Sequence, residues 1–334
     1  MLKIARRSVL RGLTTIGGAT LAAPYVRAQS SPVRIVLAGY GPPQTSFSRG
    51  LKLIGDRLQQ QFGERIALDY VLNVMDVGRR PEDLWSMVEQ GEVTLAYLTS
   101  SGLADRVPDV GIADLPFLFG DLASARSAVD GRLGAFLTQR IEGGTGLRVL
   151  GYFENGFRQV SNRLRVFSKP EDMRGMRIRV LESPWHARLF ECLGAEPVRS
   201  GLREAIAAMR AGTIDAQENP FANTMTYGAH TFHHFHTATN HLYLSRPIFV
   251  NRAVFKAWPA DLQEGLRAAV AEAVRPQRDF AAEEEITARE AIVRQGCAIA
   301  ELTSSERDAF IAAVRPVHVQ ARKEFGAEAL RIVE

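Results

Sequence analysis

Hydrophobic and polar positions follow two different periods along most of this chain of 334 residues. Short runs of apolar and β-branched residues predict strands, and longer stretches with apolar residues three or four positions apart predict amphipathic helices. Strands are expected at 33–38, 66–72, 93–98, 148–153, 177–181 and 214–216, and helices at 45–62, 81–90, 183–193 and 202–211. The alternation predicts an α/β fold with short parallel strands, whose carboxyl ends are the usual place for ligands.

A longer helical pattern occupies residues 259–299 and contains a proline at Pro276. Forty residues at the rise of an α-helix would span roughly 60 Å, which is longer than one lobe of a protein this size. The pattern therefore predicts one long helix that bridges two lobes and is kinked at Pro276, because proline removes a backbone donor and crowds the preceding turn. Two ordinary helices joined by a turn at Arg275-Pro276 are the alternative.

The first thirty residues have the pattern of an export signal. Basic residues precede a modest apolar stretch at 9–23, and Val26-Arg27-Ala28 offers a small-residue cleavage site. We expect residues 1–30 to be a signal peptide and the mature protein to be periplasmic. Arg6-Arg7-Ser8-Val9-Leu10 favours the twin-arginine route, although an ordinary secretory leader can also hold two arginines. A membrane anchor is the weaker reading, because the apolar stretch is interrupted by threonines and glycines and is shorter than about 18 residues.

The leader also changes the charge of the protein. The full chain has 41 Lys and Arg against 37 Asp and Glu, but five of the basic residues and none of the acidic ones precede residue 31, which leaves 36 against 37. The mature chain holds no basic block, so composition gives no support for nucleic-acid binding. About 300 residues exceed the size at which a single core keeps growing, so two domains are expected.

Two cysteines, Cys192 and Cys297, lie far apart in the sequence. One bridge between them is possible in an oxidising compartment, but two separate buried thiols are favoured, because a free cysteine packs as a small hydrophobe.

Candidate chemistry is concentrated in three short phrases. The phrases are Glu154-Asn155-Gly156-Phe157-Arg158-Gln159, Met176-Arg177-Ile178-Arg179-Val180 and Gly212-Thr213-Ile214-Asp215-Ala216-Gln217-Glu218-Asn219-Pro220. A guanidinium presents a planar fork of donors that matches a carboxylate and stays charged. Arg158, Arg179 and Asn219 therefore predict a cationic clamp for an organic acid. The alternative for an arginine at a strand end is a surface ion pair of little energetic value.

The chain resembles the periplasmic solute-binding proteins of tripartite ATP-independent periplasmic (TRAP) transporters, in the C4-dicarboxylate-binding (DctP) family. The resemblance rests on the phrases around Arg158 and Asn219 and on Pro170-Glu171-Asp172-Met173-Arg174-Gly175 leading into the strand with Arg179. Weaker similarities, such as Asp114-Leu115-Pro116-Phe117-Leu118-Phe119, extend it over nearly all of the mature chain.

The resemblance implies a periplasmic binding protein-like clamshell with a long kinked helix across both lobes. Lobe I would comprise residues 31–155 plus 244–284, and lobe II residues 156–243 plus 285–334. The chain segments that cross between lobes would act as hinges, so closure over a ligand is the expected motion. The implied function is a non-catalytic receptor without a cofactor, expected as a monomer, that delivers a small organic acid to a small and a large membrane subunit.

By the same resemblance, Arg179 would form the main salt bridge to the carboxylate, Arg158 would help to hold it, and Asn219 would supply an amide. Glu218 would orient these groups or be a solvated turn residue. The further candidates for substrate specificity lie in or near predicted loops, and they are Gln44, Ser100, Trp185 and Phe221. For the two aromatic residues, burial in the core is an equally good interpretation. At Gln44 many relatives have a histidine-proline pair, so its absence leaves the substrate open.

Two other functions remain open. His230, His233, His234 and His236 are spaced closely enough to bring imidazoles together around zinc or copper, as in a metal-dependent periplasmic hydrolase. A polar loop edge packed by phenylalanines is favoured over a metal site, because no recognised hydrolase motif completes the cluster. The same clamshell could also present its ligand to a sensor protein in place of a permease.

Overall fold

The computed structural model describes residues 31–333, so the predicted signal peptide lies outside the described part of the chain. Within residues 31–333, no helix combines the length and the apolar character that a membrane crossing requires.

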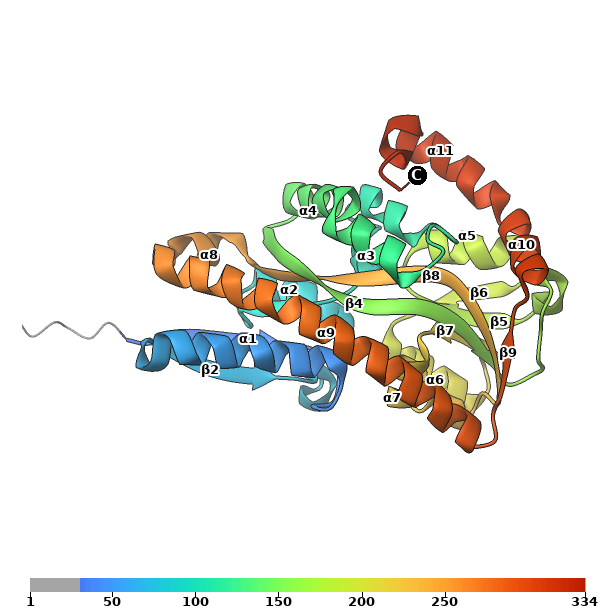
Figure 1. Ribbon diagram of the computed structural model, residues 1–334, viewed down its shortest axis with the longest axis horizontal. Coiled ribbons are helices and arrows are strands. Elements are labelled where there is room, and N and C mark those ends of the chain that lie inside the picture. The colour runs from blue at the N-terminus through green and yellow to red at the C-terminus, as the bar shows by residue number, and fades with distance from the viewer. Residues whose placement is uncertain (1–30, 334) are drawn as a thin grey trace, which may run out of the picture. The chain divides into compact units, whose positions relative to one another are not determined.

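The described chain forms one mixed nine-stranded sheet covered by helices (Figure 1). The order of the strands is β2-β1-β3-β8-β4-β7-β5-β6, and β9 pairs with β8. The strands are β1 (Val33–Ala38), β2 (Ile66–Val71), β3 (Leu95–Tyr97), β4 (Leu147–Asn162), β5 (Arg177–Val180), β6 (Glu196–Arg199), β7 (Ala216–Asn219), β8 (Phe235–Asn251) and β9 (Ala298–Glu301). The α/β class predicted from the sequence is confirmed. The expectation of short parallel strands throughout is wrong, because the two central strands are long and antiparallel to each other.

The pairing of β4 with β8 forms the centre of the sheet. It runs from Leu147 opposite Asn251 to Asn162 opposite Phe235, and its register shifts three times. One shift lies at Gly156, whose φ of 94° is in the region that favours glycine. The sequence predicted only the first part of β4, because the polar residues after Phe153 indicate a loop. It also missed β8, which begins at Phe235 inside the segment expected to be a polar loop.

Residues 31–333 contain eleven α-helices. They are α1 (Ser46–Phe62), α2 (Leu84–Glu89), α3 (Leu122–Asp130), α4 (Arg132–Gly144), α5 (Pro184–Cys192), α6 (Leu202–Ala211), α7 (Phe221–Thr226), α8 (Arg252–Ala257), α9 (Ala260–Arg294), α10 (Ser304–Ala313) and α11 (Arg315–Leu330). The sequence predicted five of these helices, which are α1, α2, α5, α6 and α9, and it missed the other six. Thr45 caps α1 by accepting a hydrogen bond from the amide of Ser48, which explains why this helix begins where its periodicity begins.

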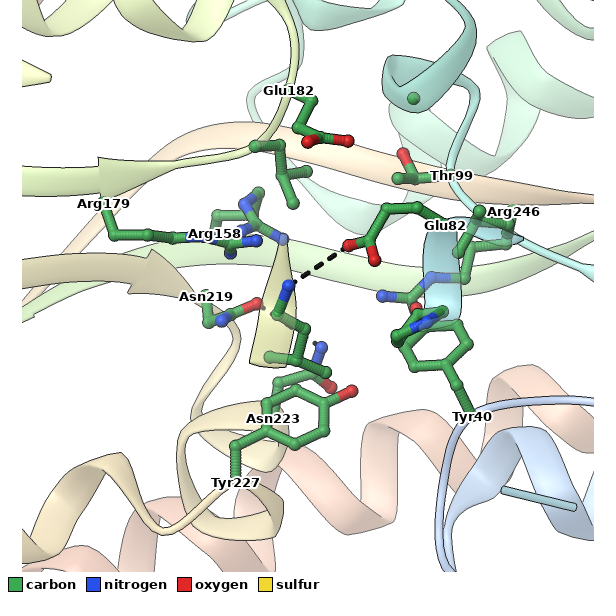
Figure 2. Close-up of a pocket in the computed structure, with 15 residues that line it drawn as sticks. Tyr40, Glu82, Thr99, Arg158, Arg179, Glu182, Asn219, Asn223, Tyr227 and Arg246 are labelled. Carbon is green, nitrogen blue, oxygen red and sulfur yellow. Dashed lines mark hydrogen bonds between the residues drawn. The ribbon is translucent and has the colours of Figure 1, made fainter. Parts of the chain in front are cut away.

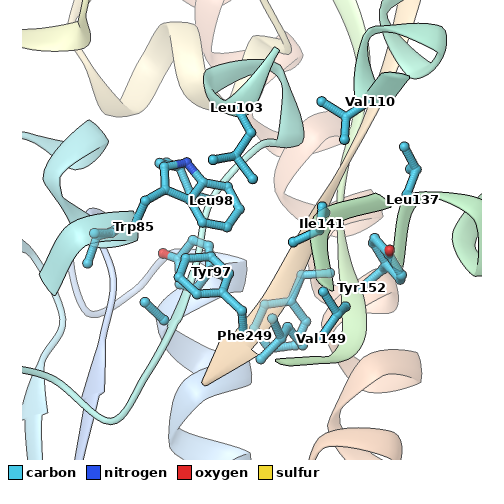
Figure 3. Close-up of a cluster of buried hydrophobic side chains, with 14 of the residues drawn as sticks. Trp85, Tyr97, Leu98, Leu103, Val110, Leu137, Ile141, Val149, Tyr152 and Phe249 are labelled. Atoms are coloured by element: carbon cyan, nitrogen blue, oxygen red, sulfur yellow. The ribbon is translucent and has the colours of Figure 1, made fainter. Parts of the chain in front are cut away.

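The described residues form two lobes that share the central strands. One lobe contains β1, β2 and β3 with α1 and α2, and the other contains β5, β6 and β7 with α5 and α6. Figure 3 shows part of the apolar core of the first lobe, where Trp85 of α2 stacks on Phe249 of β8 with ring centroids 4.0 Å apart. The lobe boundaries 31–155 plus 244–284 and 156–243 plus 285–334 stay predictions.

Helix α9 is a single helix of 35 residues with Pro276 inside it, so the alternative of two helices and a turn is wrong. It packs against α1, β4 and α7 and thereby contacts both lobes (Figure 1). Two adjacent glutamates connect it to the first turns of other helices. Glu284 accepts a hydrogen bond from the Ser46 amide (2.9 Å), and Glu285 accepts from the amides of Phe221 (3.0 Å) and Ala222 (2.8 Å). Carboxylates are favourable at such N-terminal turns.

Both cysteines are free thiols. Cys297 is buried, as expected, but the expectation of burial is wrong for Cys192, which ends α5 on an exposed position.

Gln277 attaches α9 to β4 next to the shifted register. Its side chain, fully buried, accepts from the Glu154 amide (2.8 Å) and donates to the Glu154 carbonyl (2.9 Å). We predict that Gln277→Leu lowers the free energy of unfolding by about 2–4 kcal/mol, because two buried backbone groups lose their partners. Urea denaturation checks this. The exposed Gln60→Leu on α1 is the control and should stay within about 0.5 kcal/mol of wild type; equal effects for the two variants would contradict the prediction.

Candidate ligand-binding site

A pocket with about 530 Å³ of empty space lies beside the central strands (Figure 2). Its walls come from both lobes, and the polar groups among them include three arginines, two glutamates, two asparagines and two tyrosines. The lining residues are Tyr40, Pro81, Glu82, Leu98, Thr99, Gly102, Arg158, Arg179, Leu181, Glu182, Leu202, Asn219, Asn223, Tyr227 and Arg246. A cleft with a few convergent polar groups is typical of a small-molecule site.

The three arginines are almost completely buried. The exposed fraction is 1% for Arg158, 2% for Arg179 and 4% for Arg246. Arg158 belongs to β4, Arg179 to β5 and Arg246 to β8, so strand pairing brings together residues that are far apart in the sequence. Buried cations usually have an acidic partner, because desolvation of an unpaired charge is costly.

Arg158 has such a partner in Glu218 of β7. Its Nε and Nη2 both donate to the Glu218 carboxylate, with Nη2 2.9 Å from Oε1, and Nη2 also donates to the Glu218 carbonyl. The carboxylate is completely buried. Glu218 therefore fixes the orientation of the Arg158 guanidinium. Among residues 31–333, only Nη1 of this guanidinium has no hydrogen-bond partner.

Two buried histidines surround the same carboxylate. His186 lies between Glu218 (3.3 Å) and Asp114 (3.5 Å), and His241 lies 3.4 Å from Glu218. Burial alone would raise the pKa of the Glu218 carboxyl, but Arg158 and His186 overcome it and hold that pKa well below its ordinary value. Burial would lower the pKa of His186, but the two carboxylates raise it. The Arg158–Glu218 pair is consequently ionised and fixed in position.

Arg179 has no acidic partner. Its Nε and Nη2 donate to one oxygen, the carbonyl of Ser200, at 2.9 and 2.7 Å. No carboxylate of the described chain forms an ion pair with it. Burial lowers the pKa of this guanidinium, with Glu218 opposing, yet an arginine stays protonated in proteins. The carbonyl orients the side chain and leaves its positive charge uncompensated.

Arg246 was not identified from the sequence. Its guanidinium carbon lies 4.2 Å from the ring centroid of Phe47 and 5.1 Å from that of Tyr40, and its Nε and Nη1 are buried without a hydrogen-bond partner in the described structure. The sequence feature that could have indicated Arg246 is its position as a charged residue inside the mostly apolar stretch Leu242–Asn251. Figure 2 places Arg179 and Arg246 on opposite sides of the pocket.

Asn219 ends β7 and lines the pocket beside Arg179. Its amide nitrogen donates to Gln217 (2.8 Å), and its oxygen accepts from Asn223 of α7 (3.4 Å). The β7 strand predicted at 214–216 lies at Ala216–Asn219 instead, because Asp215 uses its backbone amide and carboxylate to bind Arg177. Strand β7 thus carries two neighbouring residues of the site: Asn219, which lines the pocket, and Glu218, which pairs with Arg158.

Four residues proposed as specificity candidates do not line the pocket. Trp185 packs on Phe325 with centroids 4.9 Å apart, and Phe221 packs in an apolar cluster with Ala288 and Ile292 of α9. Gln44 is exposed, and Ser100 is buried next to Thr99, whose side chain does line the pocket.

The histidine segment lies away from this pocket. His230, His233 and His236 are buried, and His233 Nδ1 lies 3.0 Å from the Ser161 hydroxyl. Among residues 31–333, no group of three or more His, Cys, Asp or Glu side chains is arranged to hold a metal ion.

The comparison with protein families agrees with this geometry. Residues 41–324 match the family model DctP, described as bacterial extracellular solute-binding protein, family 7. The chain belongs to this family. Over 243 residues it is 31% identical to a solute-binding protein of Verminephrobacter eiseniae, a match that covers 73% of this chain and 72% of the relative. It is also 29% identical over 333 residues to the 2,3-diketo-L-gulonate-binding periplasmic protein YiaO of Escherichia coli, with 98% of each chain covered.

Solved structures of TRAP solute-binding proteins have the same fold. The sugar acid binding protein DctPAm of Advenella mimigardefordensis, in complex with galactonate, has a TM-score of 0.86 at 23% identity, over 91% of this chain and 97% of that chain. A TRAP periplasmic solute binding protein of Shewanella oneidensis with bound succinate has a TM-score of 0.85 at 22% identity, over 90% of this chain and 98% of that chain. The predicted two-lobe α/β architecture is thus confirmed.

The buried histidines predict a loss of stability in acid. Burial lowers the pKa of His233 to about 3 and of His236 to about 4, from an ordinary value of 6.5. The unfolded chain therefore binds more protons than the folded chain below pH 6.5, so stability falls as pH falls from 6.5 toward these values. We expect wild type to lose about 2 kcal/mol through His233 alone between pH 7.5 and 5.0.

His233→Asn should remove that part of the pH dependence, because an amide can retain the hydrogen bond to Ser161 without becoming charged. Urea denaturation at the two pH values measures the difference. His234→Asn, at the exposed neighbouring position, is the control and should keep the wild-type pH dependence. An unchanged pH dependence in His233→Asn would contradict the assignment.

Proposed function

We propose that this protein is a periplasmic receptor that binds a small organic acid through Arg179 and delivers it to a TRAP membrane permease. Arg158 supports the same carboxylate, and the protein performs no chemistry on its ligand. The permease would consist of a small and a large membrane subunit, as the resemblance to the family implies.

The proposal rests on the burial of Arg179 and on its lack of an acidic partner in the described chain. Its guanidinium is 2% exposed, lines the pocket and has a carbonyl oxygen as its only hydrogen-bond partner in the described chain. A carboxylate in the pocket would supply the missing negative charge and accept charge-assisted hydrogen bonds. Because Arg179 is almost completely buried, such a contact is stronger than the same contact on the surface.

Arg158 and Asn219 can act on the same ligand group. Arg158 Nη1 has no partner among the described residues, and the Glu218 carboxylate fixes the orientation of its fork. Asn219 lies on β7, between the strands that carry Arg158 and Arg179. Three neighbouring strands thus present donors to one place, as a rigid site for an anion requires.

The relatives support an organic acid as the ligand. The Escherichia coli relative is named for 2,3-diketo-L-gulonate, and the two solved neighbours contain galactonate and succinate. These molecules differ in length and hydroxylation but share a carboxylate. That shared group is the part that Arg179 would recognise.

We predict that Arg179→Ala weakens binding of the best carboxylate by at least about 100-fold, since it removes two charge-assisted contacts worth roughly 3 kcal/mol together. Arg179→Lys should be nearly as damaging, because an ammonium cannot reproduce the planar fork. The measurement is a thermal-shift screen of the wild type against organic acids, followed by calorimetric titration of the variants.

Arg177→Ala is the matched control. Arg177 lies two residues earlier on β5 and pairs with Asp215 (2.9 Å), outside the pocket. Its removal should leave the affinity unchanged. Wild-type affinity in folded Arg179→Ala would reject Arg179 as the anchor, and the absence of any binding among carboxylates would reject the receptor function.

A further inference from the structure

The side of the pocket opposite Arg179 contains charges of both signs. Arg246 lies there beside Tyr40, and Glu82 lies between Arg246 and the arginines of the clamp in the view of Figure 2. Glu182 lies three residues after Arg179, is partly buried and lines the same cavity above Glu82 in this view. This side faces the part of a ligand that is remote from the carboxylate held by Arg179.

Donors and acceptors without partners are mixed on this side. Arg246 Nε and Nη1 are buried donors without a hydrogen-bond partner in the described chain. Glu82 accepts from the Leu202 amide through Oε1 (3.1 Å), while its Oε2 is buried without a partner. The Glu182 carboxylate makes no hydrogen bond with residues 31–333. A ligand must therefore both donate and accept here if these groups are to be satisfied.

A hydroxyl group is the common ligand group that does both. Its hydrogen can be donated to a carboxylate, and its oxygen can accept from a guanidinium. A second carboxylate accepts only, and an ammonium donates only. Either of these would leave buried groups of one kind unsatisfied.

The charges on this side of the pocket also disfavour a second carboxylate on the ligand. A second carboxylate on this side would be attracted by Arg246 but repelled by both Glu82 and Glu182. Burial and the charge of Glu82 raise the pKa of the Glu182 carboxyl. Three arginines oppose this rise, and they are Arg80, Arg179 and Arg199. An ammonium would be attracted by the two glutamates and repelled by Arg246, but it could not accept hydrogen bonds from the buried Nε and Nη1 of Arg246.

We propose, on the basis of the receptor function above, that the pocket selects hydroxylated monocarboxylates over dicarboxylates and amino acids of equal length. Glu82, Glu182 and Arg246 are the residues that determine this selectivity. Arg179 and Arg158 hold the carboxylate, and the hydroxyl groups bridge the unpartnered donor of Arg246 and the unpartnered acceptors of the two glutamates.

The test is calorimetric titration of the exported protein after bound ligand has been removed by reversible denaturation and dialysis. The probes are two sets of matched acids. The four-carbon set is D-erythronate, succinate, 4-aminobutyrate and butyrate, and the six-carbon set is galactonate, adipate, 6-aminohexanoate and hexanoate. In at least one set, the hydroxylated acid should bind at least about tenfold more tightly than each of the others.

Two isosteric variants then test the residues. In Glu182→Gln and Glu82→Gln, the preference for the hydroxylated acid over the dicarboxylate should fall by about tenfold, since a carboxylate acceptor and its repulsion of the dicarboxylate are both lost. Arg246→Gln should weaken the hydroxylated acid. Glu204→Gln, at an exposed position of α6 outside the pocket, is the matched control and should keep the wild-type preference.

Each outcome decides between the two proposals. Tighter binding of a dicarboxylate or an amino acid, with loss of that binding in Arg179→Ala, would overturn the selectivity and leave the receptor function intact. A preference for the hydroxylated acid that persists in both glutamate variants would overturn the assignment of residues. Failure of every acid to bind would overturn both proposals. If Glu82→Gln does not fold, Glu182→Gln decides, because its carboxylate has no hydrogen bond within the described chain to lose.

Discussion

Two buried guanidinium groups without an acidic partner are the constraint on which the rest of this site depends. Arg158 shows the ordinary solution, since Glu218 neutralises it inside the same strand layer. Arg179 and Arg246 are equally buried but have a carbonyl oxygen and two aromatic faces, respectively, in place of a carboxylate. Desolvating a cation without compensation is costly. The site therefore gains more from an anionic ligand than an exposed pair of arginines would.

The fold keeps these groups in place through long-range backbone pairing. β4 and β8 place Arg158 and Arg246 on adjacent central strands, and the register of their pairing shifts at Gly156, two residues before Arg158. Helix α9 reinforces the same region, because Gln277 pairs with the backbone of Glu154. Rigid strands position side chains more accurately than loops do.

The sequence was sufficient for the family, for five of the helices and for the grouping of Arg158, Arg179 and Asn219 at one site, because each depends on a local pattern or a short phrase. It was insufficient where tertiary contacts determine which residues reach the pocket. Arg246 lies in an apolar stretch, and only the antiparallel pairing with β4 brings it to the pocket. Trp185 is of a residue type that is common in binding sites, but the direction of an aromatic side chain depends on packing. Here Trp185 packs against Phe325.

Glu82 connects the two lobes at the pocket. This residue belongs to the first lobe, lines the pocket and accepts the amide of Leu202 at the start of α6 in the second lobe. Other contacts between the lobes differ in burial. His186 of α5 lies 3.5 Å from Asp114 with both side chains completely buried, whereas Arg199 and Asp105 (2.8 Å) form an exposed ion pair, which contributes little. A ligand shifts a conformational equilibrium only as far as it prefers one state. A ligand that contacted Arg179 and Glu82 together would contact both lobes, and it would therefore stabilise the arrangement in which these two residues line one pocket.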